Sequence, residues 1–266
     1  MKTLAKIMAV TIFAIFCIFI CSGWAGSSED SRGTRNSEII KLKTLFEQNV
    51  GNLSVENDYW QDVSSDMLKT ISGVGEDFSQ SQYFIYVDRD PKKQFIFVCY
   101  YDATSRDIIL IGADKVSTGN PNRGKGFFIT PLGVYKNTVD IIGYRSLGTK
   151  NDKNWRGLGI KGMRVWDFGW HQSRDGRGTL VDIRLLMHAT DPDFGEQRLG
   201  QPDSKGCVRI SHKLNIFLDH YGLIDQEYEV NKSLKRLQWL LDKHREPATY
   251  AGKYVIVGDS GLKTSN

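Results

Sequence analysis

The sequence contains few cysteines and prolines and little excess charge of either sign. Its 266 residues include four cysteines and six prolines, and two of the cysteines, Cys17 and Cys21, lie within the first 25 residues. At most one pair, Cys99 and Cys207, would remain if that segment were removed, which excludes a small domain built on a disulfide framework. With 40% hydrophobic and 25% charged residues, the composition also excludes a disordered, collagen-like or coiled-coil chain.

The small net charge bears on possible partners. The formal charge of +4 falls to +2 (4 − 2) when Lys2 and Lys6, the two charged residues of the first 25, are left out. A nucleic-acid-binding domain usually concentrates many basic residues on one face. We therefore expect no nucleic-acid partner.

One long hydrophobic run lies near the N-terminus. Lys2 and Lys6 precede an apolar run over residues 7–21, and the small residues Gly23 and Ala25 follow it. This order is typical of a secretory signal peptide, so we predict cleavage after Ala25 and export to the periplasm or cell envelope. An uncleaved membrane anchor is the alternative, because the extended run approaches the roughly 18 residues that can span a bilayer.

The character of the sequence changes at Tyr83. Before it, helical spacing of apolar residues predicts a helix over residues 37–50 and a second one near 66–71. After it, runs rich in aromatic and β-branched residues predict strands at 83–87, 95–101, 108–112, 134–142 and 180–188. We expect a mainly β domain, sandwich-like or barrel-like, with flanking helices.

Further signals complete the division of the chain. Ser211 and Gly222 suit the start and the end of a helix, and a last helix (232–244) and a strand (254–257) are expected near the C-terminus. The predicted parts are a signal peptide (1–25), a linker and helical segment (26–82), a catalytic domain (83–229) and a C-terminal helix and strand (230–266).

A long connection over residues 143–178 interrupts the predicted strands. It holds eight glycines and three of the six tryptophans: Trp155, Trp166 and Trp170. A connection of roughly 36 residues is unusually long for a compact domain, which favours a lid or binding loop. Trp166 and Trp170 are candidates for substrate binding or site support. The alternative is a surface loop whose tryptophans pack on the sheet.

His188 and Cys207 could carry covalent chemistry. Alternation along the strand that ends at His188 places the histidine opposite an all-apolar face. Cys207 follows Gly206, a residue suited to a tight turn, and has Lys205 and Arg209 nearby. Nearby cations and a following helix can lower a thiol pKa from about 8.5 to roughly 3.5–7.5.

A histidine and a thiolate are the minimum for acyl transfer through a thioester. The peptide N–H groups of Gly206 and Cys207 could stabilise the oxyanion. Three other hypotheses stay open at this point. Cys207 could be a buried, inert thiol, or it could form a disulfide with Cys99. A metal site is the third, although no strong ligand spacing supports it; its candidate ligands are His188, Asp191 or Asp193, Cys207 and His212.

Two motifs around these residues resemble the L,D-transpeptidase family of the YkuD type. That family's catalytic domain carries a histidine, a spacer and then Ser/Thr-x-Gly-Cys-x-Arg, which Met187–Thr190 and Ser204–Arg209 match. Upstream, VSTG (116–119) and TPLGVY (130–135) resemble the strand-loop-strand that precedes the motif in the family. The resemblance covers about residues 83–229. Ala189 stands where many relatives have Gly, and Lys205 where many have His.

The resemblance implies cysteine-dependent cell-wall chemistry that determines cell shape. Cys207 would attack the diaminopimelate carbonyl of a peptidoglycan stem peptide, release D-Ala and form a thioester, with His188 moving the proton. An amine from a second stem peptide or from a lysine-bearing wall protein would then resolve the thioester. Arg209 would support the site or face a substrate carboxylate, and Ser204 would brace the turn. The family needs no metal or organic cofactor.

Two other functions are possible, one with the same catalytic site and one without catalysis. Water could resolve the thioester, as in an L,D-carboxypeptidase or an amidase that detaches wall proteins. Alternatively, the protein could be a wall-binding module without catalytic activity, whose tryptophans stack on sugar rings.

Overall fold

The computed structural model describes residues 32–262, so the predicted signal peptide lies outside the described residues. Residues 32–49 form a helix, close to the prediction of 37–50. A compact unit that begins at Leu45 holds all the elements described below. None of the helices between residues 32 and 262 combines the length and apolar character needed to cross a membrane.

A five-stranded sheet forms the base of this unit. Its strands lie in the order β3-β2-β1-β9-β4, with β1 antiparallel to β2 and parallel to β9. The strands are β1 (Gln82–Asp88), β2 (Phe95–Asp102), β3 (Asp107–Lys115), β4 (Gly133–Lys136) and β9 (Tyr254–Gly258). All seven residues of β1 are buried, which requires cover on both faces of the sheet.

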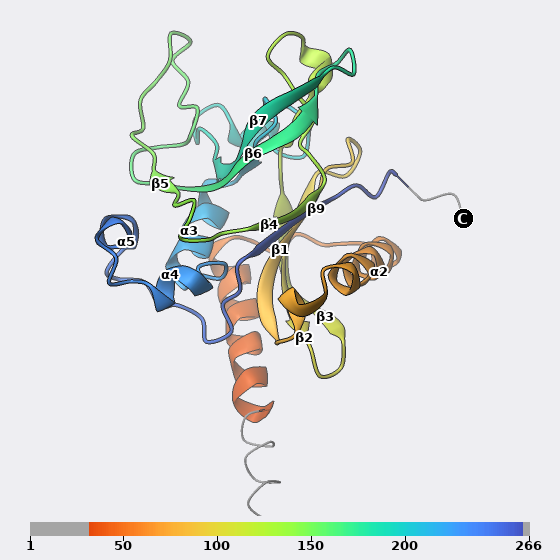
Figure 1. The fold of residues 1–266 in the computed structure, drawn as a ribbon, viewed down its shortest axis with the longest axis vertical. Coiled ribbons are helices and arrows are strands. Elements are labelled where there is room, and N and C mark those ends of the chain that lie inside the picture. The colour runs from red at the N-terminus through yellow and green to blue at the C-terminus, as the bar shows by residue number, and fades with distance from the viewer. Residues whose placement is uncertain (1–31, 263–266) are drawn as a thin grey trace, which may run out of the picture. The chain divides into compact units, whose positions relative to one another are not determined.

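Helix α2 (Asn57–Gly73) covers one face of this sheet (Figure 1). Its buried side chains recur at every fourth position and form one apolar stripe, as expected for an amphipathic helix: Tyr59, Val63, Met67 and Ile71. They join one core cluster with Phe84 of β1, Phe97 and Cys99 of β2 and Ile256 of β9. This helix is longer than the predicted 66–71.

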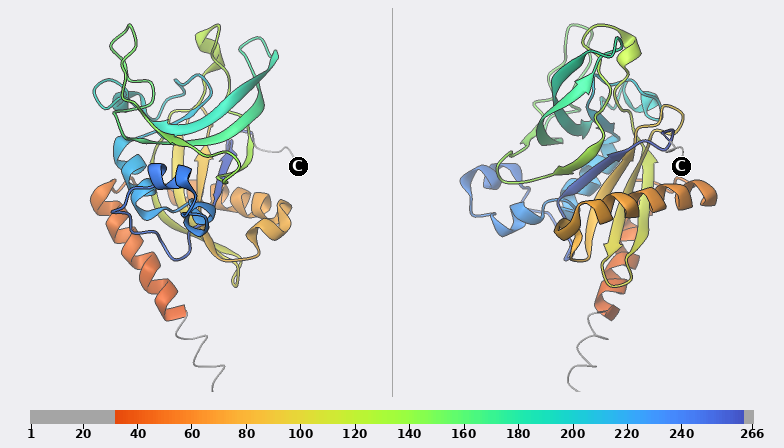
Figure 2. Two further views of the ribbon diagram at one scale, coloured as in Figure 1. Left: turned by 60° about the vertical axis from the view of Figure 1, so that its left-hand side comes forward. Right: turned by 45° about the vertical axis from the view of Figure 1, so that its right-hand side comes forward.

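A second, four-stranded sheet lies in a separate layer, and its long β6–β7 hairpin is plain in Figures 1 and 2. The order is β5-β6-β7-β8; β6 and β7 are antiparallel, and β8 is parallel to β7. Its strands are β5 (Tyr144–Arg145), β6 (Arg164–Arg174), β7 (Leu180–Ala189) and β8 (Val208–Ile210).

Helices α3 (His212–Tyr221), α4 (Gln226–Val230) and α5 (Lys235–Leu240) follow β8. The predicted ends of α3 are confirmed. The Ser211 hydroxyl accepts a hydrogen bond from the N–H of Leu214, 3.1 Å away, and Gly222 ends the helix with φ +54°. Short 3₁₀ turns occur at Gly75–Phe78, Pro121–Arg123 and Glu196–Arg198.

The predicted fold class needs correction. The chain is mixed α/β, with two open sheets and helices, and neither sheet closes into a barrel within residues 32–262. The predicted strand 134–142 is limited to β4, and the predicted helix 232–244 to α5. Residues 143–178 are not one connection, because β6 occupies Arg164–Arg174; a dense run of glycines and tryptophans hid that strand.

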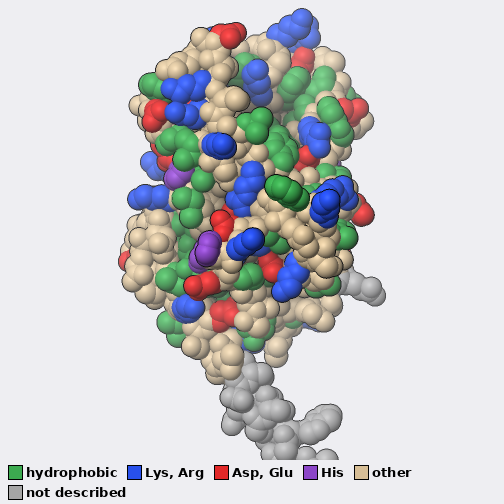
Figure 3. Space-filling view, turned by 90° about the vertical axis from the view of Figure 1, so that its left-hand side faces the viewer, with side chains coloured by type: hydrophobic (Ala, Val, Ile, Leu, Met, Phe, Trp, Pro, Cys, Tyr) green, Lys and Arg blue, Asp and Glu red, His purple; other side chains and the backbone are tan. Residues whose placement is uncertain are grey.

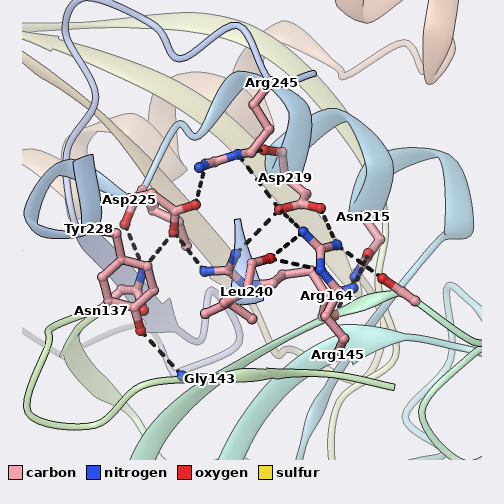
Figure 4. Close-up of polar contacts among 12 residues, drawn as sticks. Asn137, Gly143, Arg145, Arg164, Asn215, Asp219, Asp225, Tyr228, Leu240 and Arg245 are labelled. Carbon is pink, nitrogen blue, oxygen red and sulfur yellow. Dashed lines mark hydrogen bonds and ion pairs between the residues drawn. The ribbon is translucent and has the colours of Figure 1, made fainter. Parts of the chain in front are cut away.

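A buried ionic network ties the second sheet to the helices (Figure 4). Arg164 of β6 has a fully buried side chain, whose Nη1 lies 3.3 Å from Asp219 Oδ1 and whose Nη2 lies 3.2 Å from Asp225 Oδ1. Arg245 contacts both carboxylates from the segment after α5, and Asn137 donates to Asp225 at 2.8 Å. Because buried charges are costly when unpaired, this network fixes the position of β6.

Figure 3 shows one face of the molecule, on which the basic and acidic side chains of the described residues are mixed with one another.

Candidate active site

The polar face of β7 carries the predicted histidine. Burial along β7 follows the predicted alternation: Ile183, Leu185 and Met187 are buried on one face, whereas Arg184 on the other is exposed. His188 lies at the end of this polar face, opposite Val165 of β6 and Arg209 of β8.

Cys207 lies on the same face, at the start of the neighbouring strand. It comes one residue before Val208, which pairs with Met187, so Cys207 is level with Leu186. Paired residues point to the same side of a sheet, and so do residues two apart along a strand. Cys207, Leu186 and His188 therefore share one face, and the two residues predicted to react are brought together on adjacent strands.

The environment of His188 defines its tautomer and its charge. The imidazole Nδ1 lies 2.8 Å from the carbonyl oxygen of Ala189. Because a carbonyl can only accept, Nδ1 carries the proton, and Nε2 is left as the basic nitrogen. The residue is only 3% exposed. Burial lowers the pKa of His188 to about 4, with a further contribution from the positive charge of Arg209.

The turn before Cys207 is built by two hydroxyl groups. The Ser204 hydroxyl donates to the Cys207 carbonyl oxygen at 2.6 Å and accepts from the Gly206 N–H at 3.0 Å. Thr130 donates to the Gly206 carbonyl at 2.9 Å. Gly206 has φ +124°, and a Cβ there would approach Ile183 to 2.7 Å. Ser204 thus braces the turn, and the Gly206 N–H, predicted as an oxyanion donor, is already bonded to Ser204.

The segment after β3 holds this turn in place. The Ser117 N–H donates to the Arg209 carbonyl at 2.9 Å, and the Arg209 N–H returns a bond to Ser117 at 3.0 Å. The Ser204 N–H donates to the Thr118 carbonyl at 2.9 Å. The Gly119 N–H donates to the Thr130 hydroxyl at 2.8 Å. The upstream VSTG and TPLGVY segments therefore lie against the cysteine turn, and Thr130 is a support residue to which the sequence assigned no role.

The charge state of Cys207 differs from the prediction. Burial raises the pKa of the Cys207 thiol, and the negative charge of Asp167 adds to this, whereas a backbone hydrogen bond with Leu186 and the charge of Arg209 lower it in part. Lys205 is exposed, and its ammonium lies 5.8 Å from the Phe127 ring centre. The expectation of a lowered thiol pKa was wrong, because burial outweighs the cations.

Arg209 lies in a group of charged and aromatic side chains. Its Nη1 is 3.2 Å from Asp203 Oδ2, an oxygen that Arg198 also contacts at 3.2 Å. The indole of Trp155 lies beside both guanidinium groups, 5.9 Å from Arg209 and 4.9 Å from Arg198. Asp203 and Trp155 are thus the side chains that hold Arg209, and Asp203 was missed because it stands just outside the recognised motif.

The loop that remains of the predicted lid covers residues 146–163. Its ends meet, since the Ser146 N–H donates to Met163 and the Gly162 N–H donates to Ser146, both at 2.8 Å. The Arg156 N–H donates to the buried carboxylate of Asp191 at 2.7 Å. The loop is therefore closed on itself and attached to the segment that follows His188.

The three tryptophans have different surroundings. Trp155 lies in this loop and reaches the arginines of the site. Trp166 is fully buried in β6, on the apolar face of the second sheet with Met187. Trp170 is 68% exposed and lies opposite Arg184. Trp170 is therefore exposed to solvent, Trp155 is partly exposed, and Trp166 belongs to the core.

Two structural alternatives for Cys207 are not supported. Cys99 and Cys207 are both free thiols, and Cys99 is buried against Met67, so no disulfide joins them. Between residues 32 and 262 no group of three or more His, Cys, Asp or Glu side chains could hold a metal ion. Asp191, a predicted ligand, is instead bonded to the N–H groups of Arg156 and Asp193.

No profile of a known protein family matches the sequence, and no curated protein is significantly similar to it. Among solved structures, the chain is weakly similar to the helical cell shape determining protein Pgp2 from Campylobacter jejuni, at 14% identity and a TM-score of 0.26. That similarity covers 74% of this chain and 56% of the other. The resemblance to the L,D-transpeptidase family therefore stays a prediction from the motifs.

Proposed function

We propose that the protein is an exported L,D-transpeptidase that uses Cys207 as nucleophile and His188 as general base on peptidoglycan stem peptides. One observation carries the proposal. The Nδ1–H of His188 is held by the Ala189 carbonyl, which leaves Nε2 as the base on the sheet face that also presents Cys207.

The first half-reaction forms a thioester. Nε2 of His188 takes the proton of the Cys207 thiol as sulfur bonds to the donor carbonyl carbon. The resulting tetrahedral oxyanion would be stabilised by the peptide N–H of Cys207. Its collapse breaks the C–N bond, and the imidazolium returns the proton to the departing D-Ala amine.

The second half-reaction transfers the acyl group. A neutral acceptor amine attacks the thioester carbon, and the C–S bond breaks as the C–N bond forms. His188 relays the proton from the amine to the sulfur, which restores the thiol. Because burial favours the neutral forms of both residues, proton transfer accompanies the attack rather than preceding it.

Incubation of the mature protein with purified sacculi, followed by identification of the muropeptides, tests this proposal. New cross-linked dimers support transfer, and they should be absent with Cys207→Ser and retained with Cys99→Ser. Trimmed monomers alone would show that water resolves the thioester and would overturn transfer. Unchanged muropeptides with the wild-type protein would overturn the thioester chemistry as well.

A further inference from the structure

A buried carboxylate, Asp167, lies level with Cys207 on the same face of the second sheet. In the register of β6 and β7, Asp167 pairs with Leu186, and Leu186 is level with Cys207. The three residues form one row across the sheet, so two strand spacings, roughly 10 Å, separate the backbones of Asp167 and Cys207. The negative charge of Asp167 raises the pKa of the Cys207 thiol, consistent with this proximity.

The carboxylate of Asp167 has a hydrogen bond at one oxygen and an ion pair at the other. Its Oδ1 accepts a hydrogen bond from the Gly169 N–H at 3.0 Å. Its Oδ2 is buried and receives no hydrogen bond from the described part of the chain. The Nη2 of Arg184 lies 2.5 Å from this oxygen and forms an ion pair with it. A buried carboxylate needs such a cation, so a ligand cation can bind at Oδ2 only by taking the place of Arg184.

Arg184 covers Asp167 from the solvent side. The Arg184 side chain is 52% exposed, whereas that of Asp167 is 0% exposed. A half-exposed guanidinium can be rehydrated when it leaves the pair, whereas the buried carboxylate needs another cation in its place. A ligand cation can therefore replace Arg184 at Oδ2 while the carboxylate stays fixed in β6.

Tyr144 borders a cavity and lies on the same sheet face as this carboxylate. In the register of β5 and β6, Tyr144 pairs with Val165, on the face that carries Asp167 and His188. Burial raises the pKa of Tyr144, and the charges of Asp167 and Cys207 contribute to this. Tyr144 also lines a cavity of about 590 Å³ together with Leu147 and Trp155. A substrate chain in this cavity would lie against Tyr144, which shares its sheet face with Asp167 and Cys207.

We infer that Asp167 binds the ammonium group of the acceptor, with Arg184 as the cation it displaces and Tyr144 at the rim. This inference rests on the proposed function, because an acceptor is needed only when a thioester forms on Cys207. It also favours amines over water. A lysine-type amine has a pKa of about 10.4 and reaches the site as a cation, which a buried carboxylate attracts.

Transfer to the bound amine involves two proton movements. The ammonium loses one proton to solvent water as it leaves the carboxylate, and the free nitrogen lone pair attacks the thioester carbon. The C–N bond forms, the C–S bond breaks, and His188 relays a second proton from nitrogen to sulfur. The products are an amide, the Cys207 thiol and one proton in solvent. Asp167 binds the amine and takes no part in these bond changes.

Two acceptor probes with the full mature protein and a stem tetrapeptide donor test the inference. Nα-acetyl-lysine methylamide is a cation near neutral pH, and hydroxylamine is neutral. Loss of one charge-assisted contact predicts that Asp167→Asn lowers lysine-amide formation about tenfold relative to hydroxamate formation. The ratio of the two products is the readout, because any change in the acylation of Cys207 affects both products equally. Asp182→Asn, on an exposed residue of β7, should leave this ratio unchanged.

The outcomes separate the inference from the proposed function. An equal loss of both products with Asp167→Asn, or no loss, would overturn the role of Asp167 while leaving the thioester chemistry in place. Absence of D-Ala release by the wild-type protein would overturn both. If Asp167→Asn does not fold, Arg184→Gln decides: removal of the competing cation should raise the lysine-amide share severalfold, and an unchanged or lower share would contradict the inference.

Discussion

The Nδ1 nitrogen of His188 lies 2.8 Å from the carbonyl oxygen of Ala189, the next residue in β7. This contact fixes the imidazole with its proton on Nδ1, so that no acidic side chain is needed to orient it. The nearby side chain of Asp191 is bonded to the backbone N–H groups of Arg156 and Asp193. The base of the proposed reaction is therefore oriented by main chain.

The thiol of Cys207 should react as a neutral group near pH 7. Since burial raises its pKa, the rate of alkylation by iodoacetamide should keep rising beyond pH 9, the ordinary value for a thiol. Arg209→Gln should slow alkylation at any fixed pH because a stabilising cation is lost, and the exposed Lys205→Gln should not. A rate that levels off near neutral pH would instead indicate a preformed thiolate–imidazolium pair.

His188 should make the folded state sensitive to acid. Its pKa is lowered from 6.5 to about 4 by burial, so the unfolded chain binds the proton more tightly than the folded one. The stabilisation is present above pH 6.5 and is lost as the pH falls through this range, by at most about 3 kcal/mol at pH 4.

Urea unfolding of the wild-type protein and of His188→Gln, measured across this pH range, isolates that contribution. The difference in unfolding free energy between the two should shrink as the pH falls. A difference that does not change with pH would mean that His188 is not buried in its neutral form.

Thr130→Val should weaken the cysteine turn without changing side-chain volume much. The lost hydroxyl leaves the Gly206 carbonyl and the Gly119 N–H without their bonds, at a cost of about 1–3 kcal/mol in unfolding free energy. Acylation of Cys207 should slow in parallel, because the turn that presents it is less well held. The exposed Thr179 gives a matched control, and equal effects from Thr179→Val would refute this role for Thr130.

Arg164→Met should destabilise the fold strongly. It leaves the buried Asp225 without one of its cations, which predicts a loss of about 3–5 kcal/mol in unfolding free energy. Arg177→Met removes an arginine that is 85% exposed and should change stability by less than about 0.5 kcal/mol. Thermal unfolding of the two variants side by side checks this, and similar midpoints would rule out a structural role for the buried network.

Local patterns in the sequence predicted much of this site and less of the fold. Alternation placed His188 on the polar face of β7, and the cap residues Ser211 and Gly222 bounded α3, because both signals depend on neighbouring residues alone. Strand β6 was missed since the many glycines on either side of it are typical of a loop, and its strand character comes from pairing with β7. The thiol pKa was misjudged because burial depends on tertiary packing, which spacing does not reveal.

Two residues of the site that the sequence did not indicate, Asp167 and Thr130, depend on residues 40 or more positions away. The charge of Asp167 raises the pKa of Cys207 and Thr130 bonds to Gly206, and only folding brings these residues near each other. Trp166 shows the opposite error: the sequence indicated a role in the site, but its side chain is buried in the core on the apolar face of the second sheet.

Intact-mass analysis of the natively folded protein after treatment with a carbapenem, followed by peptide mapping, tests the central claim most directly. The proposed function predicts one covalent adduct, located on Cys207, that forms with Cys99→Ser and is lost with Cys207→Ser and slowed with His188→Gln. Wild-type protein that stays unmodified, or an adduct located on Cys99, would contradict it.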